Sequence, residues 1–126
     1  MTKANSSPRV VYGELDEKLL ATQTEALEKA GYHVEPVVGR RGVLEALKAG
    51  TADLVILGAS LTRNDRHHLP YMAKKANAAT RVLVLHTDGS RHPYVDANTD
   101  TGSGSEELLG KMASFRNQAA AARAGR

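Results

Sequence analysis

Two short apolar runs constrain the fold of this chain more than any other feature. Residues 54–57 read Leu-Val-Ile-Leu and are closed by Gly58, and residues 82–85 read Val-Leu-Val-Leu and lead to His86. Runs of this length and composition are typical of strands that are buried on both faces in the middle of a parallel sheet. In open parallel sheets, functional groups gather just past the carboxyl ends of the strands. We therefore look for function near Gly58 and His86.

Around these runs, strand patterns alternate with helix patterns. We predict strands over 9–13, 33–38, 53–58 and 82–85, followed by a short fifth strand at Tyr94–Val95 or Ala97–Thr99. We predict helices over 17–30, over 42–49 after a turn at 39–42, from His67–Leu69 onward after a loop at 59–66, and from Ser105 onward. This order predicts an α/β fold, a doubly wound parallel sheet with helices on both faces.

Several single residues refine these bounds. Asp16 is a good N-cap for the first helix, and Gly31 is placed to end that helix in the left-handed conformation. Pro36 has no N–H to give to a neighbouring strand, so the second strand should lie at an edge of the sheet. Pro70 fits only the first turn of a helix, which sets the predicted start of the third helix.

The composition is that of one globular domain, predicted over residues 9–116, with a disordered lead-in at 1–8 and a basic Ala/Arg-rich tail at 117–126. The 126 residues are 25% charged and 41% hydrophobic, and no apolar stretch approaches the roughly 18 residues of a membrane helix. The chain has no cysteine, which excludes disulfides, thiolate metal sites and cysteine nucleophiles. A cytoplasmic location follows as an expectation.

The net charge of +3 equals the charge of the three arginines within residues 116–126. The rest of the chain therefore has no basic face, and one Phe without any Trp leaves little for base stacking. We expect neither a nucleic acid nor a membrane as partner.

Four segments of the sequence resemble the response-regulator receiver domain of two-component signalling. They stand at residues 25–32, 44–48, 52–57 and 106–109, and the resemblance extends from residue 9 to about 115. It implies a flavodoxin-like fold with a five-stranded parallel sheet. It also implies transfer of a phosphoryl group from a histidine kinase to an aspartate beside Mg²⁺.

The residues that carry this chemistry in the family are largely replaced here. The resemblance aligns the phospho-accepting aspartate with Gly58, and the two acids after the first strand with Glu14 and Leu15, with Asp16 next. It aligns the Ser or Thr of the fourth strand with His86, with Thr87 next, and the lysine of the fifth strand with Thr101. An acyl phosphate needs a carboxylate nucleophile and cations that balance the phosphoryl charge. We therefore predict a degenerate pseudo-receiver without aspartyl phosphorylation, catalytic residue, metal or cofactor.

The segment between His86 and Glu106 is about seven residues shorter than in the family, roughly two turns of helix. We expect the fourth helix to be shortened or missing, which would bare one flank of the fourth strand. Bare apolar patches usually mark interfaces, and a homodimer would cover this one. The interface candidates are Val82, Val84, Tyr94 and Val95.

Other readings of the strand tips stay open at this point. Glu14, Asp16, His86 and Asp88 could bind a divalent cation, but a helix cap and solvated loop residues explain them as well. The leading hypothesis is a stand-alone module of bacterial phosphorelay signalling that binds a protein partner and is not an enzyme. The alternative is a small-ligand-binding protein or enzyme that uses the crevice at the strand tips.

Overall fold

The computed structural model describes residues 9–87, 95–100 and 109–114. Its elements in chain order are β1 (Val10–Glu14), α1 (Glu17–Lys29), β2 (Val34–Val38), α2 (Gly39–Leu47), β3 (Leu54–Leu57), α3 (Arg63–Ala76), β4 (Arg81–Thr87), β5 (Ala97–Asp100) and a helix over 109–114. The strands form one five-stranded parallel sheet in the order β2-β1-β3-β4-β5. The predicted α/β architecture is confirmed.

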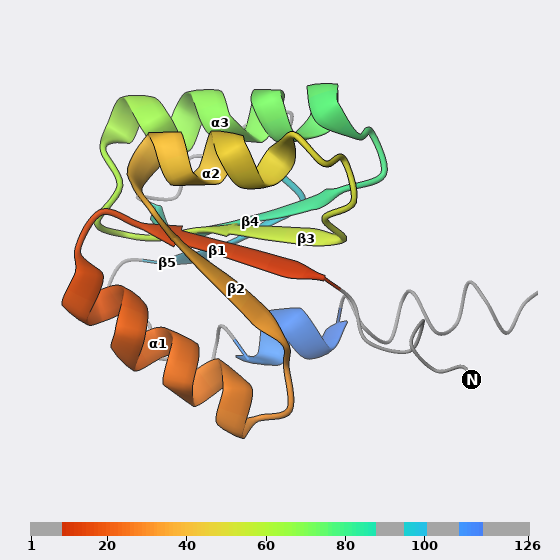
Figure 1. Ribbon diagram of the computed structural model, residues 1–126. Helices are drawn as coiled ribbons and strands as arrows, with labels where there is room; N and C mark the ends of the chain where they lie inside the picture. The colour runs from red at the N-terminus through yellow and green to blue at the C-terminus, as the bar shows by residue number, and fades with distance from the viewer. Residues whose placement is uncertain (1–8, 88–94, 101–108, 115–126) are drawn as a thin grey trace, which may run out of the picture.

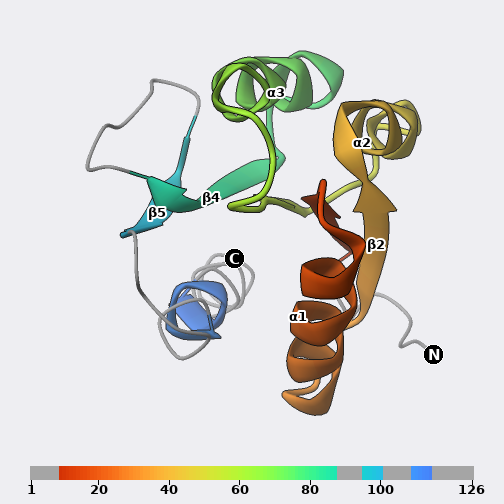
Figure 2. The ribbon, with the colours of Figure 1, turned by 90° about the vertical axis from the view of Figure 1, so that its left-hand side faces the viewer.

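Helices cover both faces of this sheet. Figures 1 and 2 show α2 and α3 on one face and α1 with the 109–114 helix on the other. Side chains alternate along the strands, so that Val11 and Val55 pack toward α2 and α3, whereas Tyr12 and Ile56 belong to the core under α1. All four residues of β3 are buried, as the apolar run predicted.

The two ends of α1 follow their local sequence. The Asp16 carboxylate accepts hydrogen bonds from the backbone N–H groups of Lys18 at 2.9 Å and Leu19 at 3.3 Å. Gly31, just past the C-terminal end, has φ +100°, a conformation that favours glycine. Both predictions are confirmed, as is the edge position of β2, the strand that contains Pro36.

The predicted starts of two helices are wrong. α2 begins at Gly39 rather than residue 42, because Gly39 turns the chain directly from strand to helix with φ +67°. α3 begins at Arg63 rather than near His67, and Pro70 lies inside it. The Thr62 hydroxyl caps α3 by accepting from Asp65 N at 3.1 Å. This cap and the burial of Pro70 in the core offset the hydrogen bond that a proline removes.

The fifth strand occupies the second of its two predicted positions, at Ala97–Asp100. Just before it, Asp96 holds this part of the chain to β4: its N–H donates to Val82 O at 2.9 Å, and its carboxylate accepts from Val82 N and Lys74 Nζ, both at 2.8 Å. The fourth-helix prediction, the lead-in and the tail lie outside the described residues. So does the predicted helix start at Ser105.

The flank of β4, which we expected to be bare, is buried instead. Val82, Val84 and Val95 are all buried, in one core cluster with Leu69 and Ala73 of α3. Their side chains pack in this core and are therefore not exposed to a partner. An interface here stays a prediction for the neighbouring residues, and the candidate Tyr94 lies outside the described part of the chain.

Candidate functional site

The site lies where β1 and β3 end side by side. Gly13 is paired with Leu57 in the parallel register, and one residue further the Gly58 N–H donates to Gly13 O at 2.8 Å. Glu14, the last residue of β1, is thereby placed next to Gly58. The structure thus brings together these two of the predicted pocket residues at the carboxyl edge of the sheet.

The Glu14 side chain is fully buried and is held by three donors. Its Oε2 accepts from the Tyr12 hydroxyl. Its Oε1 accepts from Ser60 N at 2.9 Å and from Ser60 Oγ at 2.6 Å. A buried carboxylate without partners would be strongly destabilising, so these hydrogen bonds are what allow Glu14 to stay inside.

Ser60 extends this network to the other loop. Its Oγ accepts from Leu15 N at 2.8 Å and from Asp16 N at 2.9 Å. The same hydroxyl thus donates a hydrogen bond to Glu14 and accepts hydrogen bonds from two backbone N–H groups just before α1. The loop after β1 and the loop after β3 are tied together through one serine.

Gly58 leaves the space that Glu14 fills. A Cβ built on Gly58 would lie 1.8 Å from Glu14 Cδ and 2.1 Å from each of its carboxylate oxygens. Real atoms cannot approach so closely, so any side chain at position 58 requires Glu14 to move. The carboxylate of Glu14 occupies the space next to β3 where the resemblance would put the phospho-accepting side chain.

Tyr12 completes the buried part of the site. Burial is the main cause that raises the pKa of its hydroxyl, and the hydrogen bond to Glu14 and the charge of Glu14 raise it further. Tyr12 therefore remains a protonated donor to Glu14 throughout the physiological pH range. The buried network contains one carboxylate and no cation within the described residues.

The other predicted pocket residues are placed as follows. Leu15, at the position of the second acid, is 53% exposed and contributes no ligand oxygen from its side chain. Asp16 is engaged as the cap of α1. His86 and Thr87 end β4, whereas Asp88 and Thr101 lie outside the described residues. Within residues 9–87, 95–100 and 109–114, no group of three or more His, Cys, Asp or Glu side chains could hold a metal ion.

Sequence reasoning missed Tyr12 and Ser60 as members of the site. A signal was available: Tyr12 and Glu14 are two residues apart on a strand and so point to the same face, where a buried carboxylate needs a donor.

The sequence matches no family model and no curated protein. Solved structures, in contrast, match over almost the whole chain. A signal receiver domain of an HD domain-containing protein from Pseudomonas fluorescens Pf-5 has a TM-score of 0.78 at 17% identity, covering 98% of this chain and 96% of that one. A CheY-like receiver domain protein from Methanospirillum hungatei JF-1 has a TM-score of 0.75 at 18% identity, covering 89% and 95%.

A third similar structure is the non-phosphorylated HemR receiver domain from Leptospira biflexa, with a TM-score of 0.74 at 21% identity, covering 87% of this chain and 94% of that one. The chain has the flavodoxin-like fold of receiver domains. The fold predicted from the resemblance is thus confirmed. None of the helices in the described part of the chain has the length and apolar character needed to cross a membrane.

Proposed function

We propose that this chain is a pseudo-receiver: a cytoplasmic module of bacterial two-component or phosphorelay signalling that works by binding a protein partner and not by aspartyl phosphorylation. The observation that carries the proposal is the position of the Glu14 carboxylate, which fills the space beside Gly58. The receiver fold supports the signalling context, and the buried network supports the loss of the phosphorylation step.

The chemistry of phosphoryl transfer explains why the site is unsuited to it. An acceptor must offer a carboxylate oxygen to phosphorus, with cations to balance the charge on the phosphoryl oxygens. Gly58 has no side chain, Leu15 offers no ligand oxygen, and Glu14 is fully buried with both oxygens hydrogen-bonded. The similar structure from Burkholderia pseudomallei contains a phosphorylated aspartic acid and a calcium ion, and that from Thermotoga maritima contains Mg²⁺ and BeF. On our proposal this chain forms neither state.

The network also gives the module one fixed conformation at its strand tips. Glu14 and Ser60 hold the loops after β1 and β3 in one arrangement without a ligand. A protein partner would therefore meet a preformed surface. The same packing disfavours the alternative of a small-ligand site there, since the space left by Gly58 is already occupied.

The experiment that tests the proposal is incubation with acetyl phosphate and Mg²⁺, followed by intact-mass measurement and two-dimensional amide NMR. We expect no added phosphoryl mass, and no shift of the Glu14, Gly58 and Ser60 amides with acetyl phosphate or with BeF₃⁻ and Mg²⁺. A receiver domain that phosphorylates under the same conditions serves as the positive control. A phosphoryl group on an acidic residue would refute the proposal, and amide shifts without a mass change would favour the ligand-binding alternative.

A homodimer is the partner arrangement that we propose testing first. Sedimentation over a wide concentration range gives the oligomeric state, and Tyr94→Glu should weaken a dimer formed near β4 and β5 without unfolding the chain. A strict monomer at high concentration would exclude self-association and leave a different protein as the partner.

A further inference from the structure

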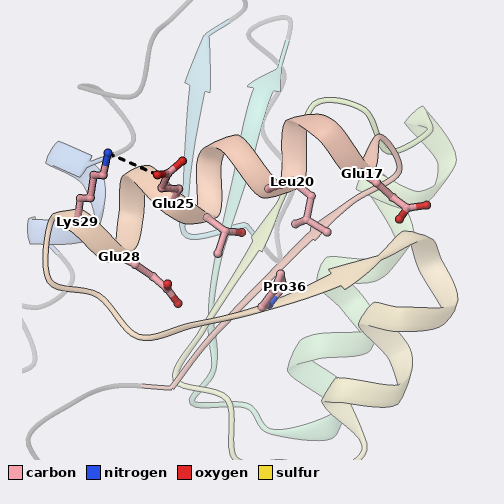
Figure 3. A pocket seen from close by; sticks show the side chains of 8 residues that line it. Glu17, Leu20, Glu25, Glu28, Lys29 and Pro36 are labelled. Carbon is pink, nitrogen blue, oxygen red and sulfur yellow. Dashed lines mark ion pairs between the residues drawn. The ribbon is translucent and has the colours of Figure 1, made fainter.

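A shallow groove with a volume of about 570 Å³ runs between α1 and β2. Figure 3 shows the side chains that line it. They are Glu17, Leu20, Ala21, Thr24, Glu25, Glu28 and Lys29 of α1 with Pro36 of β2. The groove thus has apolar and small side chains along with several charged ones.

The charges around the groove are mostly negative. Three of the lining residues are glutamates, and the single lining cation, Lys29, is paired with Glu25 at 3.5 Å. Within the described residues, Glu17 and Glu28 have no ion-pair partner. An occupant with several positive charges would therefore be attracted to this groove.

Thr24 lies in the middle of the lining. Its Oγ1 is buried and has no hydrogen-bond partner within the described residues, so an occupant of the groove would contact the rest of this side chain and not its hydroxyl. Leu20 and Pro36 supply apolar surface for the non-polar part of the same occupant.

The chain itself contains a segment of matching chemistry. Residues 115–126 read Phe-Arg-Asn-Gln-Ala-Ala-Ala-Ala-Arg-Ala-Gly-Arg, with three arginines and no acid. They follow the 109–114 helix, which lies on the same face of the sheet as α1, and Met112 shares a core cluster with Leu27 of α1. The groove lies on the β2 side of α1, away from the 109–114 helix (Figure 2), so the segment must pass around α1 to enter it. Twelve residues can span up to about 40 Å and the 13 residues of α1 extend about 20 Å, so the chain length allows both the passage and contact along the groove.

We propose that residues 115–126 bind in the groove between α1 and β2 of their own chain. The arginines pair with Glu17, Glu25 and Glu28 through charge-assisted hydrogen bonds, while alanines and the stems of the arginines lie on Leu20 and Pro36. Each pair is weak because the carboxylates are solvent-accessible. The covalent connection compensates, since it keeps the segment near the groove at an effective concentration in the millimolar range. The bound segment would shield this surface of α1 from other basic ligands, independently of the function proposed above.

The absence of cysteine makes a direct test possible. In Ala124→Cys, a spin label attached to the new cysteine is the only label on the full-length chain. We expect it to broaden the amide signals of Ala21, Thr24 and Glu28. The same label in Lys75→Cys, at an exposed position of α3 on the opposite face of the sheet, is the control and should leave these signals sharp.

A matched pair of charge variants tests the chemistry. Glu25→Gln should reduce the broadening, whereas Glu45→Gln on α2 should not, although each glutamate is exposed and paired with a lysine one turn away. Raising the salt to about 1 M, where the screening length falls to about 3 Å, should also reduce it. The proposal is overturned if these amides stay sharp in the labelled Ala124→Cys chain, or if Glu25→Gln and Glu45→Gln behave alike. It is also overturned if the broadening arises only between chains, in a mixture of spin-labelled chain and unlabelled ¹⁵N chain, because a second copy would then be the occupant.

Discussion

We expect Tyr12→Phe to destabilise the protein although it removes only one oxygen atom. The Tyr12 side chain is fully buried, and its hydroxyl donates to Glu14 Oε2. Phenylalanine keeps the ring in the core, so no cavity of consequence is created. What is lost is one of the three hydrogen bonds that hold a buried carboxylate.

The size of the effect follows from the charge of the acceptor. A hydrogen bond to a charged group contributes about 1.5–3 kcal/mol, so we expect the free energy of unfolding to fall by about 2 kcal/mol. At roughly 5 °C per kcal/mol for a domain of about 100 residues, Tm should fall by about 10 °C. Urea denaturation followed by circular dichroism at pH 7 measures the change directly.

The pH dependence gives a second, more specific signature. Burial and Glu14 raise the pKa of Tyr12 in the folded state above its ordinary value near 10. The unfolded chain therefore loses this proton near pH 10 while the folded chain keeps it, so the stability supplied by the hydroxyl is complete below pH 10 and falls as the pH rises further. The difference between wild type and Tyr12→Phe should shrink above pH 10 by up to about 1.4 kcal/mol per pH unit.

Tyr71→Phe is the control for this prediction. Tyr71 lies on α3 and is 41% exposed, with its ring stacked on His68. Its substitution should change stability at pH 7 by less than about 0.5 kcal/mol. Equal stability of Tyr12→Phe and wild type at pH 7, or a difference that stays constant from pH 7 to 11, would show that the buried hydrogen bond is not what holds Glu14.

Three further substitutions test other parts of the structure. Gly58→Asp should lower Tm and still give no added mass with acetyl phosphate, because its Cβ would overlap the Glu14 carboxylate; efficient phosphorylation of this single variant would contradict the site. Thr62→Ala removes the cap of α3 and should lower the free energy of unfolding by about 1 kcal/mol in urea, and an unchanged value would mean that the cap is not formed. Asp96→Ala removes the acceptor of the Val82 N–H and should cost about 2 kcal/mol, with faster hydrogen exchange of that amide; unchanged exchange would argue against this anchor.

Most of the fold could be predicted because it depends on short-range patterns. The apolar run of β3 is buried throughout, and Asp16 and Gly31 set the bounds of α1 through contacts within a few residues. The start of α3 could not be obtained this way. Proline has a strong local preference for the first turn, and the Thr62 cap together with burial of Pro70 in the core overrides it.

The candidate site could be predicted only in part for a related reason. The sequence shows that position 58 has no acceptor side chain and predicts that Glu14 stands at the end of the first strand, and the structure places these two residues side by side. The role of Glu14 depends on Ser60, which is 46 residues away in sequence. No local pattern reports such a contact, because it arises from the pairing of β1 with β3 and from the path of the loop after β3.

Pro36 has a consequence for how copies of this chain can assemble. It stands in the middle of β2, an edge strand of five residues, with the exposed Glu35 beside it. A strand from another molecule that tried to extend the sheet at this edge would find no N–H at Pro36 and a charged side chain next to it. The β2 edge is thereby protected against the strand-by-strand polymerisation that produces fibrils. Self-association of this protein must then rely on contacts between side chains or on the opposite edge of the sheet.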